Sequence, residues 1–161
     1  MEVKVKMVKK PIYYEMIKPV TISVGMFSEN NYKIGKGFDA IGLMETLTKG
    51  TNRAGRNHSV TIPGRPILQS TLSDNQEQIN KELTSGFARV SKGSLKTEDI
   101  GHKAGKKLLK MVRLEIYKGY FNPGNAESTT RKKGFDMPFY ETGTLAKSLG
   151  YKVNNKFYGS K

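Results

Sequence analysis

The stretch Pro138-Phe-Tyr-Glu-Thr-Gly-Thr-Leu-Ala-Lys-Ser-Leu-Gly-Tyr-Lys-Val153 decides how the last part of this chain folds. Thr142 can cap a helix by accepting a backbone N–H bond, and Gly143 can adopt the turn conformation that comes just before it. The spacing then places Leu145 and Leu149 on one face of that helix. We therefore predict a turn, a short helix and a strand, and no residue pattern here is typical of catalysis.

The segments on either side of this stretch are polar. Upstream lies the basic, hydroxyl-rich run Ser128-Thr-Thr-Arg-Lys-Lys-Gly134, and we predict an extended strap over residues 128–137. Downstream, Asn154-Asn155 is a candidate turn into a last strand that begins at Lys156.

Two apolar stripes in the middle of the chain predict two long amphipathic helices. The first begins beyond Pro66 and ends at Gly93, and its apolar residues recur at steps of three and four: Leu68, Leu72, Ile79, Leu83, Phe87 and Val90. The second begins at Thr97, where a hydroxyl and two acids suit a helix N-terminus. Its predicted buried stripe is Ile100, Ala104, Leu108, Met111, Val112 and Ile116.

The N-terminal third predicts strands and a short helix. Residues 20–27 alternate as a half-buried strand does, and Asp39 should cap a helix that ends at Gly50. Residues 51–59 have no apolar periodicity, so we expect a mobile basic loop there. Residues 1–19 form a possible arm, which contains an alternating strand pattern over its first ten residues. These elements predict one α+β domain over residues 1–161, with a small antiparallel or mixed sheet packed against the two helices.

Composition narrows the function. The formal charge of +14, from 28 Lys and Arg against 14 Asp and Glu, favours a polyanion or an acidic protein surface as partner. There is no cysteine and there are only two histidines, so we expect no metal site and no cofactor. No apolar run is long enough to span a membrane and no signal peptide is evident. We therefore expect a chain kept in the cytosol unless an assembly carries it out.

The clearest charge pattern lies on the second long helix, where Lys103, Lys106, Lys110 and Arg113 follow each other at helical spacing. Such a face can follow phosphates or dock on carboxylates, and a merely solvated helix face remains the alternative. Glycine-rich segments near Gly35 and Gly101 lack the spacing of a phosphate-binding loop. No Ser, His and Asp set with a nucleophile elbow is present, so we predict that the chain is not an enzyme.

Four stretches occur in an order that is typical of one protein family. They are Val24-Gly25, Ile62-Pro-Gly-Arg-Pro-Ile-Leu68, Thr130-Arg-Lys-Lys133 and Pro138-Phe-Tyr-Glu-Thr-Gly-Thr-Leu-Ala-Lys-Ser-Leu149. In this order they resemble the tail-completion or neck proteins of tailed phages, which include Mu-type virion morphogenesis and head-tail joining subunits. The resemblance spans about residues 20 to 154. It departs from the family at Ile67, where an aromatic residue is usual, and over Glu45-Thr-Leu-Thr-Lys-Gly50, where an Asn-Glu-Phe-Gly-like segment is usual.

The resemblance implies a structural virion protein of the head-tail junction. It would form a homo-oligomeric ring, six-fold by expectation, that joins the capsid connector to the tail and lets genomic DNA pass. The implied neighbours are portal-side or adaptor-side neck proteins and the tail terminator or tail tube, with no membrane partner. The implied place is the virion neck, after assembly in the host cytoplasm.

The candidate site residues fall into two groups under this interpretation. Contact with lumen DNA or with an acidic partner is expected from Arg53, Arg56, Lys103, Lys106, Lys110 and Arg113. Subunit-interface positions are expected to be Arg65, Pro66, Thr130, Arg131, Lys132, Thr142, Gly143 and Ser148. The alternatives are a free basic nucleic-acid-binding protein and another connector layer such as a tail terminator.

Overall fold

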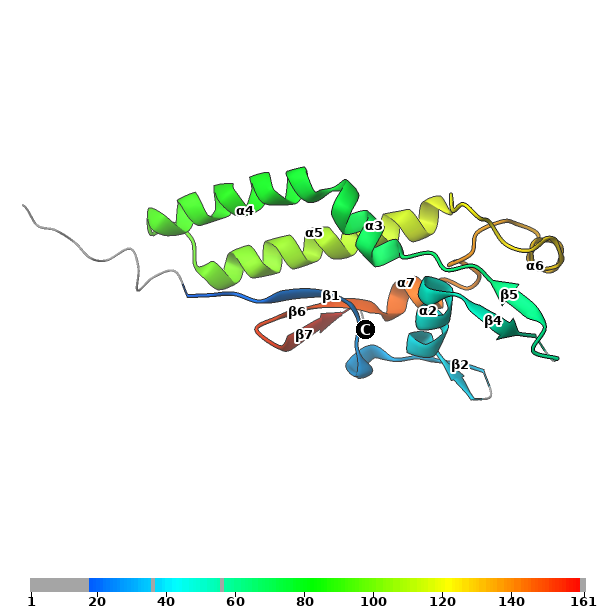
Figure 1. The fold of residues 1–161 in the computed structure, drawn as a ribbon. Helices are drawn as coiled ribbons and strands as arrows, with labels where there is room; N and C mark the ends of the chain where they lie inside the picture. Colours follow the sequence, from blue (N-terminus) through cyan, green and yellow to red (C-terminus); the bar gives the residue numbers. More distant parts are fainter. Residues whose placement is uncertain (1–17, 36, 56, 160–161) are drawn as a thin grey trace, which may run out of the picture.

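The fold is α+β, as predicted, and a computed structural model describes residues 18–159 except 36 and 56. Within these described residues, three small antiparallel sheets accompany the helices (Figure 1). The elements follow in the order β1 (Ile22–Met26), the 3-10 turn η1 (Ser28–Asn30), β2 (Lys33–Gly35), β3 (Phe38–Asp39), α2 (Ala40–Lys49), β4 (Thr51–Ala54), β5 (Val60–Ile62), α3 (Ile67–Asp74), α4 (Gln76–Ser91), α5 (Thr97–Lys118), α6 (Glu127–Lys133), α7 (Thr144–Ser148), β6 (Leu149–Val153) and β7 (Lys156–Gly159).

The central sheet joins the two ends of the described chain. Its strand order is β1-β6-β7, and both pairings are antiparallel. Val24 lies opposite Tyr151 in the register of β1 and β6. The predicted turn at Asn154-Asn155 is confirmed, since both residues have positive φ, as a tight two-residue hairpin turn requires. The alternating residues 20–27 and the last strand were therefore correctly predicted.

Helix α5 packs on the central sheet with its backbone close to strand β6. A Cβ on Gly101 would lie 2.8 Å from a methyl of Val153, and one on Gly105 would overlap the ring of Tyr151. These two glycines let the helix backbone lie directly on β6. The buried stripe of α5 includes Ile100, Val112 and Ile116 as predicted, but Leu109 is buried where the pattern indicated Leu108 and Met111, which are only half-buried.

The first long helix is interrupted at Asn75, which the apolar spacing did not predict. Helix α3 ends at Asp74 and α4 begins at Gln76. The side chain of Asn75 donates to the carbonyl of Thr71 at 2.8 Å, because short polar side chains compete for helical carbonyls. Helix α4 then packs on the face of α5 that lies away from the sheet (Figure 1).

Two predicted features of helix α2 are confirmed. The carboxylate of Asp39 accepts the N–H of Gly42 at 2.8 Å, and the helix ends at Gly50, which has φ +77°. The expected loop over residues 51–59, however, contains strand β4, which pairs with β5. A Cβ on Gly50 would lie 2.6 Å from the backbone of Gly64, so these two glycines let the base of the hairpin close. Mobility of this hairpin stays a prediction.

The expected extended strap over 128–137 is wrong for its first half, which forms helix α6. Glu127 pairs with Arg131 at 3.1 Å, one helical turn apart. Gly134 ends the helix with φ +81°, and its N–H donates to the carbonyl of Thr130. The hydroxyl-rich composition led to the prediction of an extended segment, whereas one ion pair and a glycine cap stabilise a helix there.

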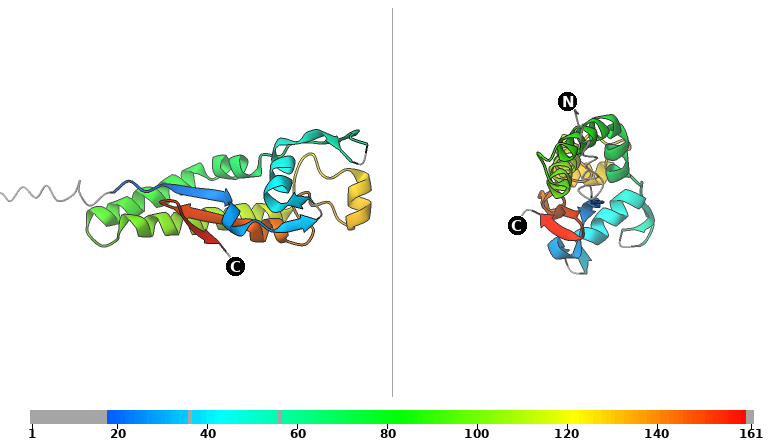
Figure 2. Two further views of the ribbon diagram at one scale, coloured as in Figure 1. Left: turned by 90° about the horizontal axis from the view of Figure 1, so that it is seen from below. Right: turned by 90° about the vertical axis from the view of Figure 1, so that its left-hand side faces the viewer.

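The molecule is elongated (Figure 2). The α4–α5 hairpin forms one end, and β2, the β4–β5 hairpin and α6 form the other (Figure 1). The core runs between them, with Phe139, Leu149 and Ile116 fully buried at its centre. The strand predicted within the first ten residues, and most of the possible arm over 1–19, lie outside the described residues.

Candidate functional site

Arg65 is used inside the subunit rather than on its surface. Only 5% of this residue is exposed. Its Nε donates to the carbonyl of Pro123 at 2.6 Å, its Nη1 donates to that of Pro63 at 3.1 Å, and its Nη2 donates to that of Gly124. Burial lowers the pKa of the guanidinium, which still remains charged. The Ile-Pro-Gly-Arg-Pro motif therefore ties the start of α3 to the loop after α5, and Arg65 has little left to offer a neighbouring subunit.

The Thr-Gly element is also held from within. Gly143 has φ +76°, as the predicted turn requires, and Leu145 and Leu149 are both buried. The predicted cap is wrong, because the hydroxyl of Thr142 bonds with that of Thr144 at 2.7 Å and not with a helical N–H. Space at the turn is open enough that glycine is needed there for its conformation.

Arg113 fixes α7 to α5. Its Nε donates to the carbonyl of Ala146 and its Nη2 to that of Leu149, each at 2.9 Å. Ala146 lies in α7 and Leu149 is the first residue of β6, so one guanidinium joins helix α5 to the helix-to-strand transition. Arg113 was predicted to face DNA or an acidic partner; the structure shows two of its nitrogens, Nε and Nη2, bonded within its own chain, and contact with a partner stays a prediction.

Lys103 is paired across the helical hairpin. Its Nζ lies 3.4 Å from Glu82 of α4, and Lys107 pairs with the same carboxylate. These two lysines lower the pKa of Glu82, mainly through the hydrogen bond from Lys107. The sequence pattern gave no sign of Glu82, because the partner lies on a different helix.

Lys106 and Lys110 are the two cations of this helix face that remain free of acidic partners within the described part of the chain. They border a hollow of about 380 Å³ together with Leu109, Arg113, Leu114 and Tyr117. Leu114 is 46% exposed and Tyr117 is 49% exposed, so the face carries apolar surface between its charges. The helical spacing of the basic residues was predicted, but the apolar residues among them were missed.

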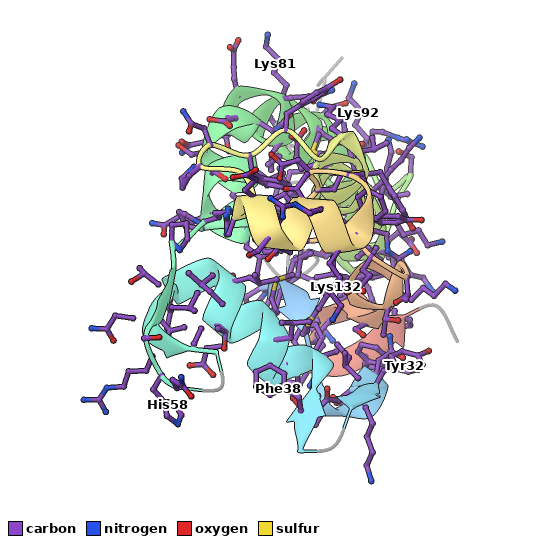
Figure 3. The ribbon with its side chains drawn as sticks, turned by 90° about the vertical axis from the view of Figure 1, so that its right-hand side faces the viewer. Tyr32, Phe38, His58, Lys81, Lys92 and Lys132 are labelled. Atoms are coloured by element: carbon purple, nitrogen blue, oxygen red, sulfur yellow. The ribbon has the colours of Figure 1, made fainter. Side chains whose placement is uncertain are left out.

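The hairpin end of the molecule exposes a second set of apolar side chains. Tyr32, Ile34, Phe38 and Val60 are between 38% and 46% exposed. Figure 3 views this end and labels Tyr32, Phe38 and His58. Arg53 is exposed in β4, its carbonyl lies 3.0 Å from Nδ1 of His58, and Arg56 lies outside the described residues. Arg53 and the lysines of α5 thus belong to different parts of the molecule and do not form one basic surface (Figure 1).

A groove of about 720 Å³ runs beside this hairpin. Its wall combines α2, the β4–β5 hairpin, the loop before α6 and the segment that leads into α7. Ile34 and Val60 line it, and the side-chain nitrogen of Asn125 is buried there without a hydrogen-bond partner among the described residues. In the groove, the apolar side chains of Ile34 and Val60 are therefore partly exposed to solvent, and the side-chain nitrogen of Asn125 has no hydrogen-bond partner among the described residues.

The remaining predicted interface residues differ in how far a neighbour could reach them. Pro66, Thr142, Arg131 and Lys132 are exposed, and Lys132 is labelled on α6 in Figure 3. Thr130 is half-buried. Gly143 and Ser148 are buried, and the hydroxyl of Ser148 donates to the carbonyl of Thr144 at 2.8 Å. An interface through α6 stays a prediction, whereas Ser148 acts within its own helix.

Neither a metal centre nor a membrane helix is found in the part of the chain that the structure describes. Residues 18–159, apart from 36 and 56, hold no cluster of three or more His, Asp or Glu side chains that could bind a metal ion. In the same residues no helix combines the length and the apolar character that crossing a bilayer requires.

Comparison with protein-family models, with curated proteins and with solved structures found no match to this chain.

Proposed function

We propose that this protein is a structural subunit of the head-tail junction of a tailed phage, where it assembles with copies of itself into a ring. The ordered motifs support this proposal through their resemblance to that family. Arg65 of the first long motif bonds to the carbonyl of Pro123, and Gly143 of the last one has φ +76° at the start of α7. A six-fold ring with genomic DNA in its lumen, between connector and tail, is the form that the resemblance implies.

The observation that carries the proposal is the exposed apolar surface at the hairpin end of the molecule. Half-exposed Ile34 and Val60 lie on a groove of about 720 Å³, and Phe38 is 46% exposed near them. Apolar surface gathered in one place on a soluble protein marks a contact with another protein. If this surface contacts a different surface of the next copy, the association is head-to-tail, and it forms a ring when the rotation between neighbours closes.

A complementation experiment tests the proposal. In cells infected by the phage with this gene deleted, we expect filled heads and free tails to accumulate unjoined. Supplying the intact chain should restore joined particles. Normal yields of joined particles without the chain would refute the junction role.

The second candidate function, a free nucleic-acid-binding protein, is favoured by the formal charge of +14. It predicts tight binding of duplex DNA by the isolated chain, with affinity falling steeply as salt rises. Weak binding with a shallow salt dependence would favour the junction subunit instead.

A further inference from the structure

We propose that the outer face of α5 binds an acidic amphipathic helix of a different protein, and not DNA. The docking face consists of Lys106, Lys110, Leu114 and Tyr117, and its hollow is also lined by Arg113 and by the buried Leu109. This inference names the partner of a face that the proposed function leaves open between DNA and an acidic neighbour, and it depends on that function only for placing the partner at the junction.

Fewer cations on this face of α5 are without partners than the sequence indicates. Of the four basic residues at helical spacing, Lys103 is paired with Glu82 at 3.4 Å, and Arg113 gives two hydrogen bonds to backbone carbonyls. Lys106 and Lys110 are the two of these four that have neither an acidic partner nor a backbone partner within the described residues. Because each neutralised phosphate contributes a slope of about 0.9 to the salt dependence of DNA binding, this face alone predicts a slope of only about 2. That is little for a surface meant to hold duplex DNA.

The apolar residues point to a protein. Leu114 and Tyr117 are half-exposed beside the hollow of about 380 Å³ that Lys106 and Lys110 border. A phosphate backbone gains nothing from an exposed leucine, whereas an amphipathic helix buries its own apolar stripe in such a hollow. Lysines at its rim would pair with carboxylates on either side of that stripe.

A second copy of the chain is a poor occupant on charge. The chain has twice as many basic as acidic residues, 28 against 14. Several of its outer carboxylates are already in ion pairs within the subunit: Glu29 with Lys152, Glu45 with Lys49, Glu77 with Lys81, Glu115 with Lys118 and Glu127 with Arg131. The occupant that complements the docking face is therefore acidic and is a different protein.

Binding of a defined probe tests the inference. The probe is a labelled synthetic helix of about 18 residues, built from Glu, Ala and Leu, with Leu at steps of three and four. Its control has the same composition in an order that gives no apolar face. We expect the probe to bind the full chain at least about ten-fold more tightly than the control peptide.

Matched variants locate the binding. Leu114→Gln should weaken binding of the probe about five- to ten-fold. Leu72→Gln, at a leucine of α3 that is 43% exposed, should leave the affinity unchanged. The double variant Lys106→Gln with Lys110→Gln should lower the affinity for the probe and make that affinity less dependent on salt. The double variant Lys92→Gln with Lys132→Gln should change neither quantity. The half-exposed position of Leu114 keeps its variant folded, and circular dichroism checks this.

Four results would overturn the inference. They are no binding of the probe at millimolar concentration, equal binding of the two peptides, equal effects of Leu114→Gln and Leu72→Gln, and a salt slope for a 20-base-pair duplex that falls by about 2 in the Lys106 and Lys110 variant while the probe is unaffected. A sedimentation coefficient that falls with Leu114→Gln would also overturn it, by indicating a second copy as occupant. Because none of these measurements uses virions, they can fail while the junction role holds, and the complementation can fail while they succeed.

Discussion

At the scale of single residues, two arginines of the predicted sites, Arg65 and Arg113, have structural roles. Arg65 and Arg113 donate to five backbone carbonyls between them, those of Pro63, Pro123, Gly124, Ala146 and Leu149. A planar guanidinium can satisfy several carbonyls at once, which explains why arginine and not lysine stands at both positions. The sequence placed Arg65 in a motif and Arg113 on the basic face of a helix, but their roles inside the subunit depend on carbonyls that lie mostly far away along the chain.

We predict that Arg65→Lys destabilises the protein by about 2 kcal/mol, because a single ammonium cannot reach all three carbonyls and leaves buried acceptors unpaired. Urea unfolding followed by circular dichroism measures this free energy. Arg53→Lys, at an exposed arginine of β4, is the control and should change it by less than about 0.5 kcal/mol. Equal free energies of unfolding for Arg65→Lys and the wild type would contradict the role of Arg65.

At the scale of elements, α5 organises the fold by packing on the sheet with one face and on α4 with another. The sequence predicted its start at Thr97 and much of its buried stripe, since amphipathic spacing is a local signal. It did not predict the interruption at Asn75, the strand β4 or helix α6. Those depend on a side-chain bond to Thr71, on the close approach of Gly50 and Gly64, and on one ion pair with a glycine cap.

Gly105→Ala separates two physical effects on α5. Helix propensity alone predicts that alanine stabilises the helix by up to about 1 kcal/mol. The added Cβ would overlap the ring of Tyr151, so we expect a net loss of about 2 kcal/mol instead. The melting temperature in thermal unfolding shows whether the variant is more or less stable than the wild type. A raised melting temperature would show that α5 does not lie on β6 as closely as described.

The ion pairs of Glu82 predict a dependence on pH. Lys107 and Lys103 lower the pKa of Glu82 below its ordinary value in the folded state. The stabilisation, about 0.5–1 kcal/mol, is present above the unfolded pKa of about 4.3 and is lost as pH falls through the lowered folded pKa. Glu82→Gln should therefore be less stable than the wild type at pH 7, and the difference should vanish near pH 2. Urea titrations at both values measure it, and a difference that persists at the acidic value would contradict the ion pairs.

At the scale of the whole molecule, the two ends have different surfaces. The α4–α5 hairpin forms one end, and the hairpins with their exposed apolar residues form the other (Figure 2). Sequence reasoning predicted the α+β class, but placed Arg53 and the lysines of α5 in one basic surface, which the fold separates. Periodicity shows which face of an element is buried, and only the packing shows which faces become neighbours.

We expect the hairpin end to drive self-association. Ile34→Ser with Val60→Ser removes apolar surface from the groove and should weaken association about ten-fold or more, with little effect on folding, because both residues are at least 40% exposed. Sedimentation velocity over a range of concentrations measures this. Leu72→Ser, on α3, is the matched control. Equal association of the double variant and the control would place the subunit contact elsewhere.

The central claim, a structural role at the head-tail junction, is tested most directly by imaging virions that carry a labelled copy of this chain. We predict that gold particles bound to a C-terminal tag lie at the neck, between head and tail, in particles seen by electron microscopy. Label on the capsid, label at the distal tail, or virions without label despite full expression of the tagged chain would contradict the account.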